Sequence, residues 1–195
     1  MIFLWLQSQT FYKNLQTSAI SNIAPSTYHQ SWVDIGCSTG LLTRLAHALG
    51  YDVIGYDLNR LSLQVAKLLS FKKKNIAYKH EDFYTIEKTF DVISATSLLS
   101  VVDDKRHALN KLISLLKNTD STLIIIEPTE KLTLKNVYAL IHDFKTFWFY
   151  KGLLLWAIAR EGKAIDKSIY QQIDHVQIEH SYFIEDMVSV TYIYH

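Results

Sequence analysis

A single cysteine, Cys37, stands among the 195 residues of this chain. One thiol cannot form an intrachain disulfide, and it cannot supply a cysteine-rich metal site. Chains without disulfides are typical of reducing compartments, so we expect an intracellular, cytoplasmic protein. Histidines and acids also never fall at metal-ligand spacing on one expected element, and the sequence therefore predicts no metal site.

An excess of either charge is missing as well, because 20 Lys and Arg stand against 19 Asp and Glu. No global positive field would draw the protein onto a phosphate polymer. The longest late apolar run, 147–159, is broken by Lys151 and Gly152 and is shorter than the ~20 residues that a membrane span requires. The sequence therefore predicts no nucleic-acid partner and no transmembrane segment, and it leaves the oligomeric state open.

The length limits how much structure the chain can hold. With 195 residues, of which 49% are hydrophobic, the chain can bury one substantial core but falls short of two typical domains. No internal repeat or low-complexity tract divides it. We therefore expect one domain, residues 1–195.

Short apolar runs alternate with amphipathic stretches over most of the chain, which is typical of parallel α/β sheets. Helical spacing of apolar positions predicts helices over 2–23, 41–49, 59–70 and 104–117. Strands are expected at 32–35, in a run that ends on Asp57, and at 76–80, 90–95, 121–127, 180–184 and 187–194. Because crossovers between parallel strands are right-handed, the sheet should be doubly wound, with its strand order reversing beside the first strand. Ligands bind at such a switch point.

The stretch 31–57 carries the most specific motif. An apolar run stops at a turn that contains Gly36 and Gly40, an amphipathic run follows, and a second apolar run ends on Asp57. Glycines let the backbone approach a ligand, and the helix that begins near Leu41 points free N–H groups at it. Asp57 can accept both hydroxyls of a ribose. The unit is therefore typical of a site for a nucleoside-containing cofactor.

The spacing of the turn decides which cofactor is expected. The dinucleotide fingerprint G-x-G-x-x-G does not fit the turn from Asp34 to Gly40. The turn instead resembles motif I of the class I S-adenosylmethionine-dependent methyltransferases, in which an acid and one apolar residue precede alternate glycines. Gly36 and Gly40 match the outer glycines, while Ser38 stands at the middle one. Asp57 matches the ribose-binding acid, and the resemblance covers about 32–127 and, more weakly, the terminal strands.

This resemblance implies a fold, a cofactor and a set of contacts. The fold would be α/β, a doubly wound, mostly parallel seven-stranded sheet with an antiparallel last strand. The cofactor would be S-adenosyl-L-methionine, with Asp57 on its ribose, Asp82 on the adenine amino group and Asp34, through the turn, on the amino group of its tail. The segment 96–102 would line its methionine half. The implied cofactor-binding residues are Asp34, Gly36, Cys37, Ser38, Gly40, Asp57, Leu58, Asp82, Phe83 and Ala95.

Residues 132–177 form a helical insertion after the fifth strand and are the least family-like third of the chain. Aromatic side chains crowd its first half, Phe147 and Tyr150 among them. One interpretation is a helical pair that packs on the sheet, and the other is a cap over an apolar substrate. The two interpretations stay open together.

The acceptor and the catalytic residues are harder to predict, because methyl transfer depends chiefly on positioning and has no obligatory catalytic side chain. Amino-directed nucleic-acid and glutamine methyltransferases of the resembled class usually carry Asn- or Asp-Pro-Pro-aromatic after the fourth strand, and the sequence from Ser94 to Ser97 lacks this pattern. We expect a small, largely apolar or aromatic acceptor. The catalytic residues stay unknown, and each possible general base is more typical of a structural role: His142, His175, His180 and Glu127.

Two other functions compete with a methyltransferase. A non-catalytic binding or scaffold protein can keep this fold. Relatives that have lost catalytic activity often lose the glycines or the ribose-binding acid, whereas this chain keeps Gly36, Gly40 and Asp57. A nicotinamide-dependent oxidoreductase is disfavoured by the spacing of the turn. The sequence therefore favours an enzyme that transfers a methyl group.

Overall fold

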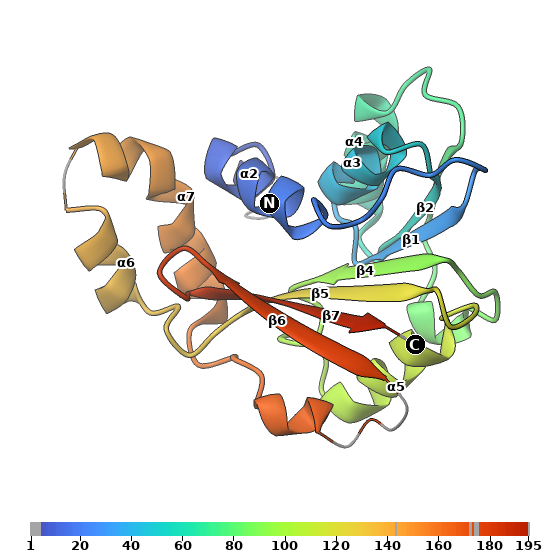
Figure 1. Cartoon of the computed structure of the whole chain (residues 1–195). Helices are drawn as coiled ribbons and strands as arrows, with labels where there is room; N and C mark the ends of the chain where they lie inside the picture. The colour runs from blue at the N-terminus through green and yellow to red at the C-terminus, as the bar shows by residue number, and fades with distance from the viewer. Residues whose placement is uncertain (1–4, 143, 172, 174–175, 195) are drawn as a thin grey trace.

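One seven-stranded sheet organises the computed structural model, which describes residues 5–142, 144–171, 173 and 176–194. The strand order is β3-β2-β1-β4-β5-β7-β6 (Figure 1). The strands are β1 (Ser31–Ile35), β2 (Asp52–Tyr56), β3 (Ile76–Lys79), β4 (Val92–Thr96), β5 (Thr122–Pro128), β6 (Gln177–Phe183) and β7 (Val188–Tyr194). The first five pair in parallel, and β7 lies antiparallel between β5 and β6. The predicted fold, with its reversal beside β1 and its antiparallel last strand, is confirmed.

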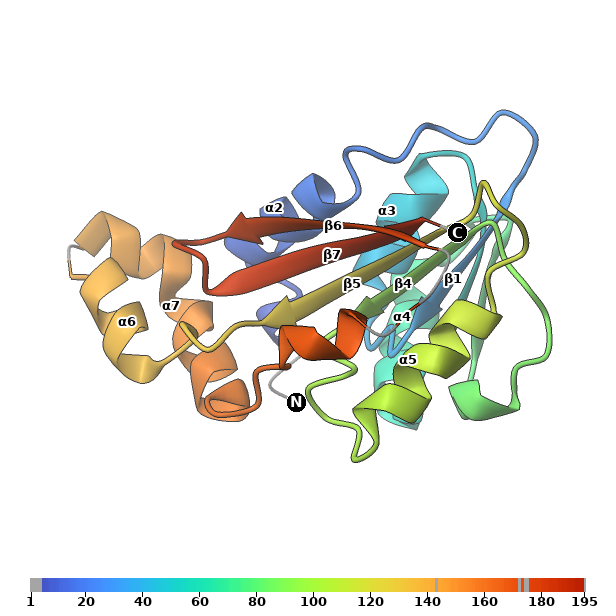
Figure 2. The same ribbon diagram turned by 60° about the horizontal axis from the view of Figure 1, so that its bottom comes forward.

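Helices cover both faces of this sheet (Figures 1 and 2). One face carries α2 (Thr10–Ala19), α3 (Leu41–Ala48) and α4 (Arg60–Leu69), and the other carries α5 (Lys105–Ser114). Short 3-10 turns follow β3 at η1 (Phe83–Thr85) and precede β6 at η2 (Lys167–Tyr170). Because helices lie on both faces, nearly every residue of the central strands β1, β4 and β5 is buried, and most of these residues are apolar.

Side-chain caps set where the helices begin. The carboxylate of Asp104 accepts the N–H of His107 at 2.9 Å, and the Asn59 amide oxygen accepts the N–H of Ser62 at 3.1 Å. Both residues are therefore N-caps, which lie just outside their helices. The predicted Asn59 cap is confirmed. The helix predicted to reach residue 117 ends at Ser114, because the chain then turns to pair with the segment that leads into β4.

The C-terminal hairpin is longer than its sequence pattern suggested. β6 begins at Gln177 instead of residue 180, and its register runs from Gln177 opposite Tyr194 to Phe183 opposite Val188. Polar residues alternate along β6 because it is an edge strand with an exposed face. Such a pattern resembles a loop in sequence, and only pairing with β7 makes it a strand.

The predicted insertion after β5 is present as two helices, α6 (Leu134–Leu140) and α7 (Phe144–Arg160). Leu153 and Trp156 of α7 are fully buried, and the Trp156 ring meets the Tyr12 ring of α2 edge-on at 5.4 Å. Tyr150 lies against Phe11, also of α2, with ring centroids 5.8 Å apart. The insertion thus packs on α2 as a helical pair. Within the described part of the chain, no helix is long and apolar enough to span a membrane.

Candidate functional site

The turn after β1 is shaped by three residues with left-handed backbone, Gly36, Ser38 and Gly40, whose φ angles are 70°, 49° and 72°. The N–H groups of Gly36 and Cys37 both donate to the carbonyl of Tyr56, at 2.8 and 3.0 Å. These bonds tie the turn to the end of β2. A Cβ at position 40 would lie 2.8 Å from the Tyr78 ring, so this turn excludes a side chain there for steric reasons as well as conformational ones.

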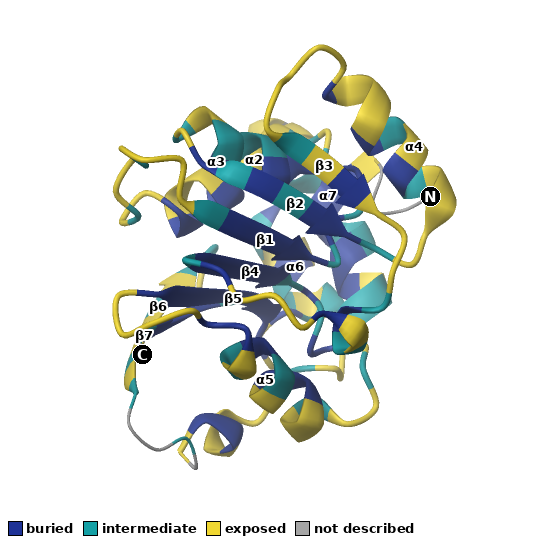
Figure 3. Cartoon of the chain, turned by 90° about the vertical axis from the view of Figure 1, so that its right-hand side faces the viewer, coloured by how far each residue is buried: buried dark blue, intermediate teal, exposed yellow. Residues whose placement is uncertain are grey.

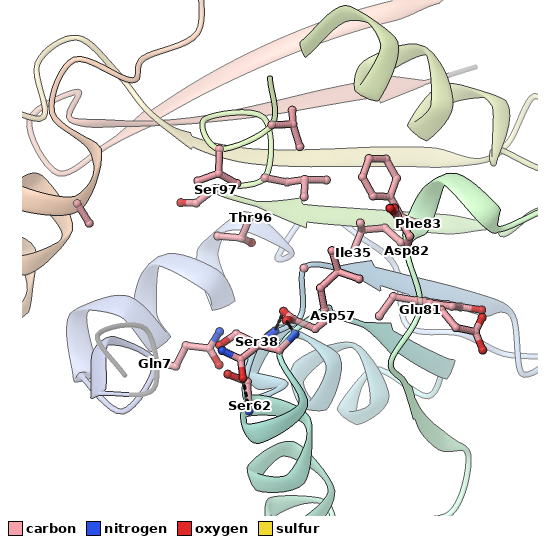
Figure 4. Close-up of a pocket in the computed structure, with 18 of the residues that line it drawn as sticks. Gln7, Ile35, Ser38, Asp57, Ser62, Glu81, Asp82, Phe83, Thr96 and Ser97 are labelled. Atoms are coloured by element: carbon pink, nitrogen blue, oxygen red, sulfur yellow. Dashed lines mark hydrogen bonds between the residues drawn. The ribbon is translucent and has the colours of Figure 1, made fainter. Parts of the chain in front are cut away.

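Asp57 lies directly after β2 and is held by the same turn. One carboxylate oxygen accepts the N–H of Ser38 at 2.8 Å, and the other accepts the N–H of Asn59 at 2.7 Å (Figure 4). Each oxygen has a second lone pair that these bonds leave available. The structure therefore presents a carboxylate that is fixed in place and can still accept two hydrogen bonds from a ligand.

A cleft of about 680 Å³ opens where these segments meet, at the carboxyl ends of β1, β2 and β4. Ser38 and Asp57 lie on one side of it, and Thr96 and Ser97 lie across from them (Figure 4). Its volume is typical of sites for cofactors and small molecules. The lining residues are Gln7, Tyr12, Ile35, Gly36, Ser38, Tyr56, Asp57, Leu58, Asn59, Ser62, Glu81, Asp82, Phe83, Tyr84, Thr96, Ser97, Leu98, Val101, Val102, Ala159 and Arg160.

The residues expected to bind the cofactor divide into two groups. Six of them line the cleft: Gly36, Ser38, Asp57, Leu58, Asp82 and Phe83. The other four are buried behind its wall: Asp34, Cys37, Gly40 and Ala95. Cys37 packs in a small core between α4 and β3, and burial raises the pKa of its thiol. The segment 96–102, which the resemblance assigns to the methionine half of the cofactor, contributes five residues to the lining of the cleft.

Asp34 shows what a buried member of the motif does. Its carboxylate accepts hydrogen bonds from the hydroxyls of Thr43 in α3, at 2.7 Å, and Ser94 in β4, at 2.9 Å. Burial raises the pKa of Asp34 to about 6, against the lowering effect of those two bonds. The side chain thus joins two strands and a helix beneath the turn. It positions Gly36 and Ser38 from behind the cleft wall.

Comparison with known proteins agrees with this geometry. The model of the methyltransferase domain family matches residues 7–169. The chain belongs to this family. The predicted class, S-adenosylmethionine-dependent methyltransferases, is thereby confirmed together with its cofactor, and nothing in the comparisons favours a non-catalytic protein.

Relatives of the methyltransferase carry a more specific name. A protein of Colwellia psychrerythraea (strain 34H / ATCC BAA-681), named ubiquinone biosynthesis O-methyltransferase, is 28% identical over 184 residues, which are 85% of this chain and 73% of that protein. A protein of the same name from Pseudoalteromonas translucida (strain TAC 125) is also 28% identical, over 93% of this chain and 82% of that protein.

Solved structures share the fold at low identity. The plantazolicin methyltransferase BpumL, in complex with SAH, aligns with a TM-score of 0.66 at 13% identity, over 99% of this chain and 84% of that one. The N-methyltransferase NodS from Bradyrhizobium japonicum WM9, also in complex with SAH, aligns with a TM-score of 0.66 at 12% identity. This alignment covers 96% of the present chain and 88% of the NodS chain.

Several lining residues of the methyltransferase gave no signal in the sequence. Gln7 precedes α2, and its side-chain oxygen accepts bonds from the Thr39 hydroxyl and, at 3.4 Å, from the N–H of Leu41. Tyr12 comes from α2 and Arg160 from the last turn of α7. These residues reach the cleft only because helices far apart in sequence pack together beside the turn. No local motif marks them.

The possible general bases of the methyltransferase lie elsewhere. Glu127 is buried, accepts the N–H groups of Leu99 and Ser100 at 2.7 and 3.3 Å, and has its pKa raised to about 7 by burial. His180 bonds to the Thr191 hydroxyl at 2.9 Å. Neither these two nor His142 lines the cleft, and His175 lies outside the described residues. The carboxylate of Glu127 instead holds the loop after β4, which forms part of the cleft wall.

Two of the aromatic residues that crowd the first half of the insertion also lie away from the cleft. Phe147 and Tyr150 are not among its lining residues. The described part of the insertion reaches the cleft through Ala159 and Arg160, at the end of α7. Across the described residues, we find no group of three or more His, Cys, Asp or Glu side chains that could hold a metal ion.

Proposed function

We propose that this methyltransferase transfers the methyl group of S-adenosylmethionine to a hydroxyl oxygen of a small, largely apolar or aromatic acceptor. The uneven lining of the cleft carries this proposal. Acidic side chains, Asp57, Glu81 and Asp82, gather on the side of β2 and β3, whereas apolar side chains follow β4. The apolar half is formed by Leu98, Val101 and Val102 together with Ala159 of α7. The names of the two relatives support oxygen as the attacking atom.

The polar half of the cleft fits the cofactor. The two carboxylate oxygens of Asp57 can each accept a further hydrogen bond, as two neighbouring ribose hydroxyls would require, and Gly36 presents no side chain toward the space above the turn. In our proposal Asp57 holds the ribose, Asp82 meets the adenine amino group, and Leu58 covers the adenine face. The bound cofactor supplies an electrophilic methyl group on a positively charged sulfur.

The chain's own residues would position the acceptor and shield it from solvent. Leu98, Val101 and Val102 give this half an apolar lining, and the water that a bound acceptor displaces from it would no longer weaken electrostatic interactions at the reacting atoms. Burial and the nearby carboxylates raise the pKa of Tyr12 far above neutrality. Tyr12 therefore stays protonated and can donate a hydrogen bond to an acceptor oxygen. Positioning of this kind can supply much of the rate acceleration.

Product analysis tests the attacking atom. Matched acceptors that differ only in a phenolic hydroxyl or an aromatic amine, each with an apolar substituent, are incubated with the full chain and methyl-labelled S-adenosylmethionine. We expect label on the hydroxyl compound, located on oxygen by mass spectrometry. A parallel reaction contains RNA in place of the small acceptors. Label on nitrogen, or label on RNA with neither small molecule methylated, would contradict the proposal.

Two adjacent residues of α7 test where the acceptor binds. Ala159→Trp places a large ring in the apolar half of the cleft, whereas Ile158→Trp changes the next residue, which is exposed and does not line the cleft. We expect Ala159→Trp to raise the acceptor KM at least tenfold while the affinity for S-adenosylhomocysteine stays within twofold. The Ile158→Trp enzyme should resemble the unchanged protein. Equal acceptor KM values for the two variants would place the acceptor elsewhere.

A further inference from the structure

Helix α4 carries apolar side chains on the side that faces away from the sheet. Its inner face is formed by Leu63 and Ala66, which are buried. Leu61 and Leu68 lie two turns apart on the opposite side, and their exposed fractions are 71% and 73%. Phe71, just after the helix, is also 73% exposed. Figure 3 shows these outer turns of α4 as exposed while the strands behind are buried. An ordinary surface helix would have polar residues at these positions.

The same segment is strongly basic although the whole chain is nearly neutral. No acidic residue occurs from position 58 to position 80. Five cations with exposed positions flank the apolar side chains: Arg60, Lys67, Lys72, Lys73 and Lys74. The formal net charge of the chain is +1, so the positive charge here is local. Exposed leucine and phenylalanine side chains among clustered cations are typical of a helix that lies in a membrane interface.

We propose that this α4 surface, formed by Leu61, Leu68, Leu69, Phe71 and the five cations, binds the surface of a bilayer that contains anionic phospholipid. The apolar side chains enter the boundary between headgroups and acyl chains, and the cations meet the phosphate groups. A bilayer satisfies both parts of the surface at once, whereas a nucleic acid would leave the apolar side chains in water. Docking of this kind is peripheral and needs no membrane-spanning helix.

The position of α4 connects this surface to the cleft. Leu58, Asn59 and Ser62, at the beginning of the helix, line the cleft, and Leu61 lies between them. A bilayer against α4 is therefore next to the cleft mouth. An apolar acceptor dissolved in the lipid would reach the enzyme by this route. This last consequence rests on the proposed function, whereas lipid binding itself does not.

Vesicle binding tests the proposal with the full chain. Vesicles of equimolar phosphatidylcholine and phosphatidylglycerol are compared with vesicles of phosphatidylcholine alone, in a flotation or sedimentation assay. We expect binding to the anionic vesicles to be at least roughly tenfold tighter, and to weaken at high salt, which screens the charges. No preference for anionic vesicles, or no binding at all, would overturn the proposal.

Paired variants separate charge from apolar contact. Replacing Lys72, Lys73 and Lys74 with Gln should weaken binding about tenfold or more. The control is the same change at three exposed lysines in other parts of the chain, and it should alter the affinity for anionic vesicles less than twofold: Lys13, Lys88 and Lys163. Phe71→Gln should weaken binding, while Tyr28→Gln, at an aromatic residue that is 88% exposed, should not. Equal losses in the test and control variants would contradict the assignment to α4.

Two further measurements keep the result unambiguous. The affinity for S-adenosylhomocysteine, measured in the absence of vesicles, should stay unchanged in all of these variants, because they alter the surface and leave the fold and cofactor site intact. A failure of methyl transfer to any small acceptor would leave the vesicle result standing, so the two proposals fail separately.

Light scattering tests whether a second copy of the chain occupies the α4 surface instead. A concentration-dependent dimer that Leu61→Gln with Leu68→Gln abolishes would assign α4 to a second copy of the chain and overturn bilayer binding.

Discussion

Replacing Asp57 with Asn tests the cofactor site most directly. Asp57 accepts one backbone N–H on each carboxylate oxygen, from Ser38 at 2.8 Å and from Asn59 at 2.7 Å. The amide of an Asn has a single oxygen, so one of these N–H groups would face an NH₂ group instead of an acceptor. The substitution also removes the negative charge that strengthens hydrogen bonds to ribose hydroxyls.

The size of the effect follows from these two losses. A hydrogen bond to a charged group contributes about 1.5 to 3 kcal/mol, so the dissociation constant for S-adenosylhomocysteine should rise by roughly 10- to 150-fold. The unpaired N–H should lower the free energy of unfolding by about 1 to 3 kcal/mol. Because Asp57 lies in the loop after β2 and outside the buried core, we expect the variant to fold.

Calorimetric titration with S-adenosylhomocysteine measures the first loss, and urea unfolding measures the second. Asp91→Asn is the matched control, because Asp91 also accepts a backbone N–H, from Ser31 at 2.8 Å, and an Nζ–H of Lys117 at 3.0 Å. It does not line the cleft, so the control should lose stability and keep its affinity. An unchanged affinity in Asp57→Asn, with circular dichroism intact, would refute the role of Asp57 in holding the ribose.

Three other predictions follow from the site. S-adenosylmethionine or S-adenosylhomocysteine should bind with a micromolar dissociation constant, about −8 kcal/mol, and NAD much more weakly; calorimetry showing tighter NAD binding would refute this. Burial raises the pKa of Asp34 in the folded state to about 6, so the stability that its protonated form contributes is present below pH 4 and is lost as the pH rises through 6. Asp34→Asn should remove roughly 3 kcal/mol of this pH dependence, measured by urea unfolding between pH 4 and pH 8. Gly40→Ala should cost roughly 1 to 3 kcal/mol more stability than Gly162→Ala, because both positions have positive φ but only position 40 adds a collision with a tyrosine ring; equal losses would show that the ring moves aside.

The sequence by itself determined the parts of this protein that depend on local order. Apolar strands of the right length, caps such as Asn59, and the glycine turn between β1 and α3 predicted the sheet, its switch point and an acid, Asp57, directly after β2. These features are local because strand periodicity, capping and positive φ depend on a few neighbouring residues. The class of the enzyme follows from them, since the turn and Asp57 lie within one continuous stretch.

Only the tertiary structure decided which side chains face the cleft. Asp34 and Ala95 were expected to bind the cofactor but are buried behind the cleft wall, while Tyr12 and Arg160 line the cleft from helices about 150 residues apart in the chain. Packing of α7 against α2 brings them together, and no pattern within either helix encodes that contact. The strand β6 likewise exists because β7 supplies its hydrogen-bond partners. Local sequence fixed the cofactor turn, whereas long-range packing shaped the half of the cleft in which we place the acceptor.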